Sequence, residues 1–254
     1  MISVMGSNKI QFIADSKEML DVLERPYPSI KKLPDWLCNT PSYIGGVRSV
    51  DAHSTTNSTV KKCMPVMDSM TAGYHIPTHS DIWVEYGGDE NIMIRWAWHT
   101  LEIINLHKKE ELQTYPIPNG FCPTPFKFLN PWIIKTKKGW SSYLTHPLHY
   151  DDLPFKCVPA IVDTDKYPNN INFIFFLKRG FSGLIPKGTP IMQVIPFKRE
   201  NFKSEFSYDK SGFLKRQWEK ASTEFFDIYK RHFRSQKKYE QGDVKKCPFH
   251  FLHK

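Results

Sequence analysis

Short runs of apolar residues with interspersed polar ones dominate the middle of the chain, from Lys62 to Arg199. In Ile92–Trp98, for example, Arg95 places a charge on one face of an otherwise apolar run. Period-two runs separated by glycine-containing turns predict strands rather than helices. The predicted strands are Asp81–Tyr86, Ile92–Trp98, Leu101–Leu106, Phe126–Lys135, Trp140–Leu144, Cys157–Asp163, Ile171–Leu177 and Pro190–Phe197. We expect no helix in this region, and a mainly β fold that forms a barrel or a sandwich.

The N-terminal part has a different pattern. Asp15 or Ser16 can cap a short helix that runs through Arg25, just before two prolines. The segment 31–37 is predicted to be extended, and residues 39–62 to form a polar loop because serine, threonine, asparagine and glycine predominate there.

The C-terminal part predicts an amphipathic helix over residues 211–238, with Ser211 as its N-cap. Its apolar face comprises Leu214, Trp218, Ala221, Phe225, Ile228 and Tyr229. Its basic face comprises Lys215, Arg216, Lys220, Lys230, Arg231, Arg234 and Lys237. The chain is therefore expected to consist of an N-terminal arm and loop (1–62), a β domain (63–200) and a basic helix with a tail (201–254).

The positive charge is concentrated in this C-terminal part. Of 35 Lys and Arg against 26 Asp and Glu, residues 198–254 hold 15 and 8, which leaves 20 against 18 upstream. The net charge of +9 is thus +7 in the tail and +2 in the rest of the chain. The basic helix could bind the phosphates of a nucleic acid, but docking of its apolar face with a solvated basic face is the favoured interpretation.

Several common classes of protein are not indicated. The sequence has no Walker loop, GxGxxG, HExxH or GxSxG motif, and its longest apolar run, Ile171–Leu177, is far shorter than the roughly 20 residues that span a bilayer. The five cysteines are widely spaced and form no CxxC pair, and no signal peptide is visible at the start. We therefore expect a protein of a reducing cytoplasm that does not enter a membrane.

Two clusters of histidine and aspartate carry the candidate chemistry. His75 and His79 form an HxxxHxD pattern, and His146 and His149 form an HxxH pattern followed by carboxylates. Imidazole and carboxylate groups could converge on a divalent metal, while the alternative is that they are polar residues at the ends of a sheet.

Four segments in order resemble trimeric dUTPases and their dCTP-deaminase relatives. They are Ala72–Pro77, Trp132–Trp140, Ile161–Tyr167 and Ile185–Ile195, which together cover about residues 65 to 200. The resemblance implies a β-clip fold of the jelly-roll type, a homotrimer and a nucleotide ligand. With the two clusters it places ligand-binding residues at Tyr74, His75, His149, Asp165, Tyr167 and Gln193. The segments Pro34–Trp36, Thr59–Pro65 and Pro186–Ile191 also resemble an uncharacterised family of phage and bacterial proteins.

The catalytic positions of that family are altered in this chain. His75 stands where the family has an aspartate, and His146-Pro147-Leu148 stands where it has a phosphate-binding Arg-Ser-Ser segment. Asp163 matches the aspartate that orients the attacking water, while Tyr167 is displaced by one residue. Because proline and leucine cannot replace the contacts of an arginine with phosphate, ordinary dUTP hydrolysis is not expected.

Three hypotheses follow. The favoured one is a phage-type β-clip protein that has lost dUTPase catalysis and either binds a small ligand such as a nucleotide or serves in assembly, in the host cytoplasm if it is phage-encoded. The second is a metal-dependent hydrolase of phosphoesters or pyrophosphates in which Asp163 and His146 are catalytic and His75, His79, His146 and His149 are metal ligands. The third is a nucleic-acid-binding module that uses Lys215, Arg216, Lys220, Lys230, Arg231 and Arg234.

Overall fold

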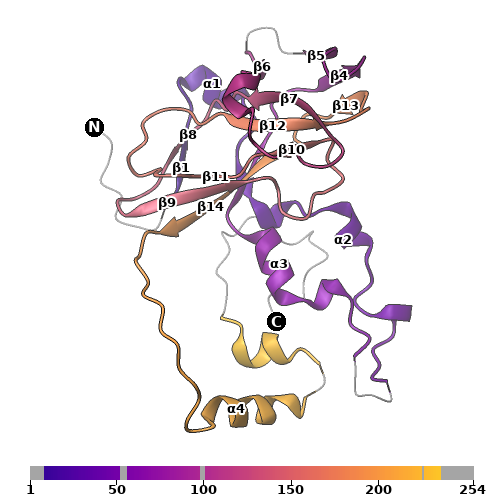
Figure 1. Ribbon diagram of the computed structural model, residues 1–254, viewed down its shortest axis with the longest axis vertical. Helices are drawn as coiled ribbons and strands as arrows, with labels where there is room; N and C mark the ends of the chain where they lie inside the picture. Colours follow the sequence, from indigo (N-terminus) through magenta and orange to yellow (C-terminus); the bar gives the residue numbers. More distant parts are fainter. Residues whose placement is uncertain (1–8, 52–55, 98–100, 225, 236–254) are drawn as a thin grey trace. The chain divides into compact units, whose positions relative to one another are not determined.

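The computed structural model describes residues 9–51, 56–97, 101–224 and 226–235 (Figure 1). By their contacts, the described residues among 1–29 and 73–199 form one compact unit, and those among 30–72 and 200–254 form another. We call them the β unit and the second unit. The predicted boundaries at residues 62 and 200 group the chain differently, because α3 (Met64–Thr71) belongs to the second unit and residues 9–29 belong to the β unit.

The fold is mainly β, and all fourteen strands of the described residues lie in the β unit. They form antiparallel sheets in the orders β10-β12-β7-β6, β11-β9-β14-β3-β2, β13-β4-β5 and β1-β8, and no closed barrel is formed by these strands. Their bounds are β1 Gln11–Ile13, β2 Tyr27–Pro28, β3 Tyr74–Pro77, β4 Ile82–Tyr86, β5 Ile92–Trp96, β6 Ile104–Leu106, β7 Phe121–Phe128, β8 Ile133–Lys135, β9 Trp140–Thr145, β10 Phe155–Cys157, β11 Ala160–Val162, β12 Phe173–Lys178, β13 Gly183–Ile185 and β14 Pro190–Lys198.

Two predicted strands are each divided in the structure. The run Phe126–Lys135 is split between β7 and β8 at Asn130-Pro131, and the run Cys157–Asp163 is split between β10 and β11 at Pro159. Each proline lies in the short connection after which the chain joins another sheet, at a position where it has no ladder hydrogen bond to donate.

Helices fit the predictions less closely. The short N-terminal helix is confirmed at its start as α1 (Lys17–Val22), where Ser16 Oγ accepts the Met19 N–H as its cap, but it ends before the predicted Arg25. The expectation of no helix after Lys62 is wrong, because α3 (Met64–Thr71) forms there and buries three methionines at a spacing of three residues. The expectation of an extended segment at 31–37 is also wrong in part, because it runs into α2 (Asp35–Asn39).

The long C-terminal helix is interrupted. Helix α4 spans Phe213–Ser222, and a π-helical turn follows at Tyr229–Phe233. Asp227 between them has φ 59°, a left-handed conformation that no α-helix accommodates. The predicted single helix is therefore wrong between the two, and its residues 225 and 236–238 lie outside the described part of the chain.

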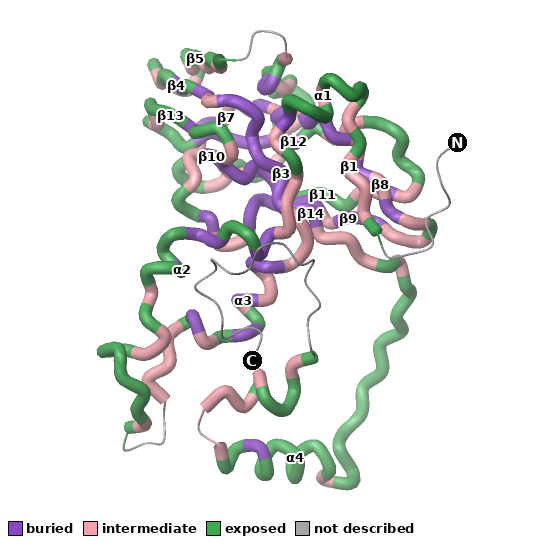
Figure 2. Tube along the Cα trace, turned by 180° about the vertical axis from the view of Figure 1, so that it is seen from behind, coloured by how far each residue is buried: buried purple, intermediate pink, exposed green. Residues whose placement is uncertain are grey.

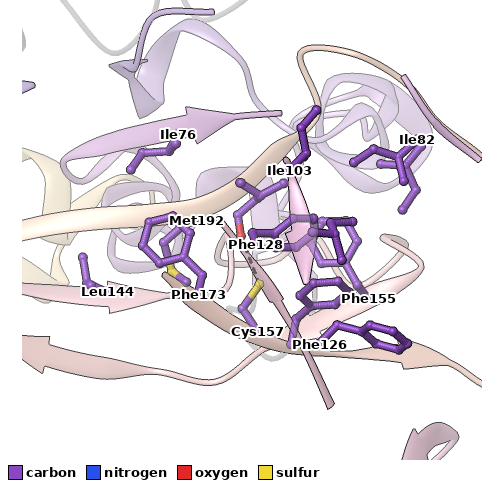
Figure 3. Close-up of a cluster of buried hydrophobic side chains, with 14 of the residues drawn as sticks. Ile76, Ile82, Ile103, Phe126, Phe128, Leu144, Phe155, Cys157, Phe173 and Met192 are labelled. Atoms are coloured by element: carbon purple, nitrogen blue, oxygen red, sulfur yellow. Dashed lines mark hydrogen bonds between the residues drawn. The ribbon is translucent and has the colours of Figure 1, made fainter. Parts of the chain in front are cut away.

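The hydrophobic core of the β unit is built on aromatic residues from three strands (Figure 3). The rings of Phe128 and Phe175 stack with centroids 3.9 Å apart, and Phe155 meets both rings at steep angles. Ile76, Leu144 and Met192 add aliphatic side chains from the five-stranded sheet. The two larger sheets therefore share one core, and Figure 2 shows the buried residues, in purple, concentrated along these strands.

Candidate binding site on the β unit

Four polar residues, two of them predicted to bind a ligand, lie in one row across the five-stranded sheet. Tyr27 of β2 is opposite His75 of β3, His75 is opposite Gln193 of β14, and Gln193 is opposite Thr145 of β9. His75 and Gln193 are fully buried, and Gln193 Oε1 accepts the Leu148 N–H at 2.9 Å. The register thus brings His75 and Gln193 together as predicted ligand residues, but within the interior of the unit.

His146 is a structural residue of this interior. Its Nε2 lies 3.1 Å from the Tyr150 carbonyl oxygen and its Nδ1 accepts the Cys157 N–H at 3.4 Å. Burial lowers the pKa of His146 to about 4, so the ring is neutral near pH 7. Because one ring nitrogen donates and the other accepts, neither has a lone pair left for a metal or a substrate proton.

His79 and His149 are placed apart from that arrangement. His79 Nδ1 accepts the Glu24 N–H at 3.1 Å, so the proton of the neutral ring resides on Nε2, and burial lowers its pKa to about 4. His149 occupies a left-handed backbone conformation with φ 65°. Among the described residues, which include all four predicted histidine ligands, no three His, Cys, Asp or Glu side chains are grouped so that they could hold a metal ion.

The two predicted aspartates meet an arginine that the sequence did not single out. Arg199 Nη1 donates to Asp165 Oδ1 at 2.9 Å and lies 3.0 Å from Asp163 Oδ1, while Ser141 Oγ donates to Asp163 at 2.7 Å. The Arg199 hydrogen bond lowers the pKa of Asp165 to about 2, and the Ser141 hydrogen bond and then Arg199 lower that of Asp163. Both carboxylates are therefore ionised and held in an ion-pair network.

Tyr167 comes just after these two aspartates in the chain. Its backbone N–H donates to the Asp163 carbonyl oxygen, and its side chain is 42% exposed. The predicted residues Asp163, Asp165 and Tyr167 thus share one turn after β11, separate from the buried row that contains His75 and Gln193.

An open pocket adjoins the Asp165–Arg199 network. We call it the Trp140 pocket; it has an empty volume of about 340 Å³ and is lined by Lys9, Ile10, Tyr74, Thr136, Lys137, Trp140 and Pro196. Lys137 Nζ lies 5.5 Å from the centroid of the Trp140 ring. Gly139 connects the two features, because its N–H donates to Asp165 and it precedes Trp140 in the chain. Gly139 has φ 86°, which a glycine adopts without strain.

Sequence reasoning named Tyr74 among these lining residues and missed the others. The run Lys137-Lys138-Gly139-Trp140 is predicted as a turn leading into a strand and belongs to a segment that resembles dUTPases, but none of its residues is predicted to bind a ligand. A turn that carries lysines next to a tryptophan is a sequence signal for a cation–π contact, which Lys137 and Trp140 make here. No local sequence pattern marks Arg199 as a site residue, because its role depends on its contacts in space with Asp163 and Asp165 in the turn after β11.

Three of the six predicted nucleic-acid residues of the second unit pair with acidic side chains. Arg234 pairs with Asp68 at 2.6 Å and its side chain is 7% exposed, and Arg231 pairs with Glu224 at 2.7 Å. Lys215 lies 3.8 Å from Glu219, and Arg216 Nη1 donates to the Ser211 carbonyl oxygen. Lys220 is exposed on α4, and Lys230 belongs to the π-helical turn. The charge of three of these residues is therefore partly balanced within the unit.

Comparisons with known proteins add no relative. No family model matches the chain, and a search of curated proteins finds no match. Among the helices of the described residues, none has the length and apolar character needed to cross a bilayer.

Proposed function

We propose that the β unit binds a small anionic ligand with a planar ring, such as a nucleotide, in the Trp140 pocket. The observation that supports this most directly is the position of Lys137 over the Trp140 ring at the edge of an open pocket that also has Lys9 and Tyr74 in its wall. Aromatic faces stack on planar rings, and lysine ammonium groups neutralise phosphate or carboxylate.

We also propose that the protein does not catalyse ordinary dUTP hydrolysis. Asp163, which the resemblance to dUTPases would make the water-orienting residue, hydrogen-bonds Ser141 and pairs with Arg199. His146 uses both ring nitrogens within the protein. These contacts support a protein that binds its ligand without ordinary dUTPase catalysis. That it is a phage-type β-clip protein is proposed from the sequence resemblance alone.

The setting that we propose is a reducing cytoplasm, that of the host if the protein is phage-encoded. The four cysteines of the described residues support this, because Cys38, Cys63, Cys122 and Cys157 are all free thiols.

Removing the Trp140 ring is expected to abolish most nucleotide binding. A panel of nucleoside mono-, di- and triphosphates is titrated into the full chain in a calorimeter, and at least one is expected to bind saturably. Trp140→Ala should weaken that binding by about tenfold or more, since stacking of a base on an aromatic ring contributes about 1–3 kcal/mol. Lys137→Gln should weaken it and reduce its dependence on salt.

The matched control is Trp36→Ala, which removes a partly exposed tryptophan of the second unit. It should leave nucleotide affinity unchanged. Failure of every nucleotide to bind, or equal loss in Trp36→Ala and Trp140→Ala, would refute the proposal.

A second candidate function, assembly, is favoured by the linker segment at residues 200–212. This segment contains no helix or strand, and Phe202, Phe206 and Tyr208 are 88%, 96% and 76% exposed (Figure 2). The outer face of the sheet β13-β4-β5 also exposes apolar side chains, with Trp83 directly opposite Leu184. We propose that the linker segment of one chain packs on this face of a second copy, a head-to-tail contact that closes into a ring such as a trimer.

Replacing the three aromatic residues should prevent this assembly. The wild-type chain is expected to be an oligomer by light scattering after gel filtration, and Phe202→Ser with Phe206→Ser and Tyr208→Ser should be a monomer with unchanged circular dichroism. Trp83→Ser should have the same effect from the other side of the contact. A monomeric wild type, or an oligomer that survives both changes, would contradict the proposal.

A further inference from the structure

The turn that precedes β7 has a chemically labile sequence. It consists of Pro118, Asn119, Gly120 and Phe121, and the pair Asn-Gly occurs nowhere else in the chain. The Phe121 N–H donates to the Pro118 carbonyl oxygen at 3.1 Å, and Gly120 has φ 82°. A positive φ at the third of the four residues is typical of a type II turn, which favours glycine there because glycine has no Cβ. Asn119 and Gly120 therefore form the tip of the turn.

The reactive groups at this tip are accessible. Asn119 and Gly120 are both exposed. No residue that the structure describes forms a hydrogen bond with the Asn119 side chain or accepts one from the Gly120 N–H. A side-chain carbon added to Gly120 would meet no atom within 4 Å beyond its chain neighbours, so the space around this residue is open. The Asn119 amide can therefore turn toward the next backbone nitrogen without hindrance.

We propose that Asn119 is a site of spontaneous deamidation. The Gly120 nitrogen attacks Cγ of Asn119, the bond from Cγ to Nδ2 breaks, and ammonia leaves with the proton that the Gly120 nitrogen gives up. Water then opens the resulting five-membered succinimide. Opening at Cγ yields aspartate with a normal backbone, and opening at the main-chain carbonyl carbon yields isoaspartate, whose backbone runs through Cβ and Cγ. Water is the co-reactant, and nothing is oxidised or reduced. This modification is independent of ligand binding and of assembly.

Folding slows the reaction at this turn only moderately. Ring closure requires rotation of the backbone at Asn119. That rotation breaks the hydrogen bond that closes the turn and the bond in which the Arg179 N–H donates to the Gly120 carbonyl oxygen at 2.9 Å. Two hydrogen bonds of ordinary net strength correspond to a slowing of about thirtyfold relative to the unfolded chain.

Asn57 provides an internal comparison, because it precedes Ser58, a small residue that also permits ring closure. Its Oδ1 accepts the Ser49 N–H at 2.9 Å. Its Nδ2 donates to the carbonyl oxygens of Ile44 and Val47 at 2.9 and 2.6 Å. Its backbone N–H and carbonyl oxygen are also hydrogen-bonded, to Ser49 and Ile44. Since five hydrogen bonds hold this residue, folding should slow deamidation here at least about tenfold more than at the Asn-Gly turn.

The isoaspartate product is expected to loosen the start of β7. Its backbone is longer by one carbon, directly before the glycine whose carbonyl oxygen accepts the Arg179 N–H. The next residue, Phe121, pairs with Lys178 of β12. Hydrogen exchange at the Arg179 N–H should therefore become faster by about tenfold in the isoaspartate form, which corresponds to the loss of one hydrogen bond. Asn119→Asp, which keeps the normal backbone, should leave that exchange rate unchanged.

Incubation of the full chain at neutral pH tests the inference. Parallel samples are kept in buffer and in concentrated guanidinium chloride, and the peptides that contain Asn119 and Asn57 are followed by mass spectrometry. A protease that cleaves before aspartate but not before isoaspartate distinguishes the two products. Deamidation at Asn119 should be about thirtyfold slower in the folded chain than in the unfolded one, and Asn57 should be slowed at least about tenfold more.

Asn119→Gln is the matched variant. It keeps an exposed amide at the tip of the turn, and it should abolish the reaction there because the longer side chain closes a ring far more slowly. Persistence of the same deamidated peptide mass in this variant would place the reaction elsewhere and overturn the inference. So would a folded chain in which Asn119 is slowed as much as Asn57, or an unfolded chain in which Asn119 does not react.

Discussion

Acidification from pH 7 to about pH 4.5 is expected to remove about 5 kcal/mol from the stability of the β unit through two histidines alone. His79 and His146 are both buried, and burial lowers the pKa of each from the ordinary 6.5 to about 4. The unfolded chain therefore takes up a proton at each histidine near pH 6.5, whereas the folded chain does so only near pH 4. Since the total stability of a domain is typically about 5–15 kcal/mol, this loss is enough to unfold a marginal one.

The sign and the pH range follow from these two values. Because the folded-state pKa lies below the unfolded-state pKa, the contribution to stability is fully present above pH 6.5. It decreases as the pH falls and reaches its limit below the folded value of about 4. The Asp165 carboxylate, whose pKa is lowered to about 2, loses its contribution only at still lower pH, so the two effects are separable.

Urea unfolding at several pH values between 7 and 4.5 measures the effect. In His146→Gln the glutamine amide can still donate to Tyr150, and it does not titrate. The slope of the unfolding free energy against pH should therefore decrease by the amount that corresponds to about one fewer proton taken up on unfolding than in the wild type. His79→Gln should give a similar decrease, and the double variant should lose about two protons. Equal slopes in the wild type and the double variant would show that neither ring is held neutral by burial.

Periodicity predicted the β unit well where one side of a strand is buried along its whole length. Strands β4, β5, β12 and β14 lie where alternating or continuous apolar runs placed them. Prediction was less successful where a single residue changes the direction of the chain. Pro131 and Pro159 divide runs that look continuous, and the left-handed Asp227 divides a helix whose apolar spacing continues across it.

For the candidate site, too, the sequence predicted some features correctly and could not predict others. The sequence indicated that His75 and Gln193 belong to one site, and the sheet register does place them opposite each other. It could not show that both are fully buried, because burial depends on which sheets pack together. It also could not connect Arg199 with Asp165, since a contact across 34 residues depends on β9 lying between β11 and β14. Local patterns thus indicate the chemistry of a residue, while tertiary packing decides whether a ligand can reach it.

The ring stack at the centre of the β unit is expected to give the largest loss of stability from a single substitution. Phe128 and Phe175 are fully buried, and their rings stack at 3.9 Å in a core that both larger sheets contribute to. Phe128→Ala should cost about 3–5 kcal/mol, because it removes the transfer free energy of the ring and leaves a cavity that the adjacent strands cannot fill. Phe128→Leu should cost less, because it retains most of the volume.

The matched control for that substitution is Phe213→Ala, which removes the same ring from a position on α4 that is 53% exposed. It should lower the free energy of unfolding by about 1 kcal/mol or less, because about half of this residue already contacts solvent. Equal losses in Phe213→Ala and Phe128→Ala would contradict the prediction, and a small loss in Phe128→Ala would show that the two sheets do not share a tightly packed core. The difference between the two variants therefore measures how far the stability of the chain depends on the aromatic core of the β unit.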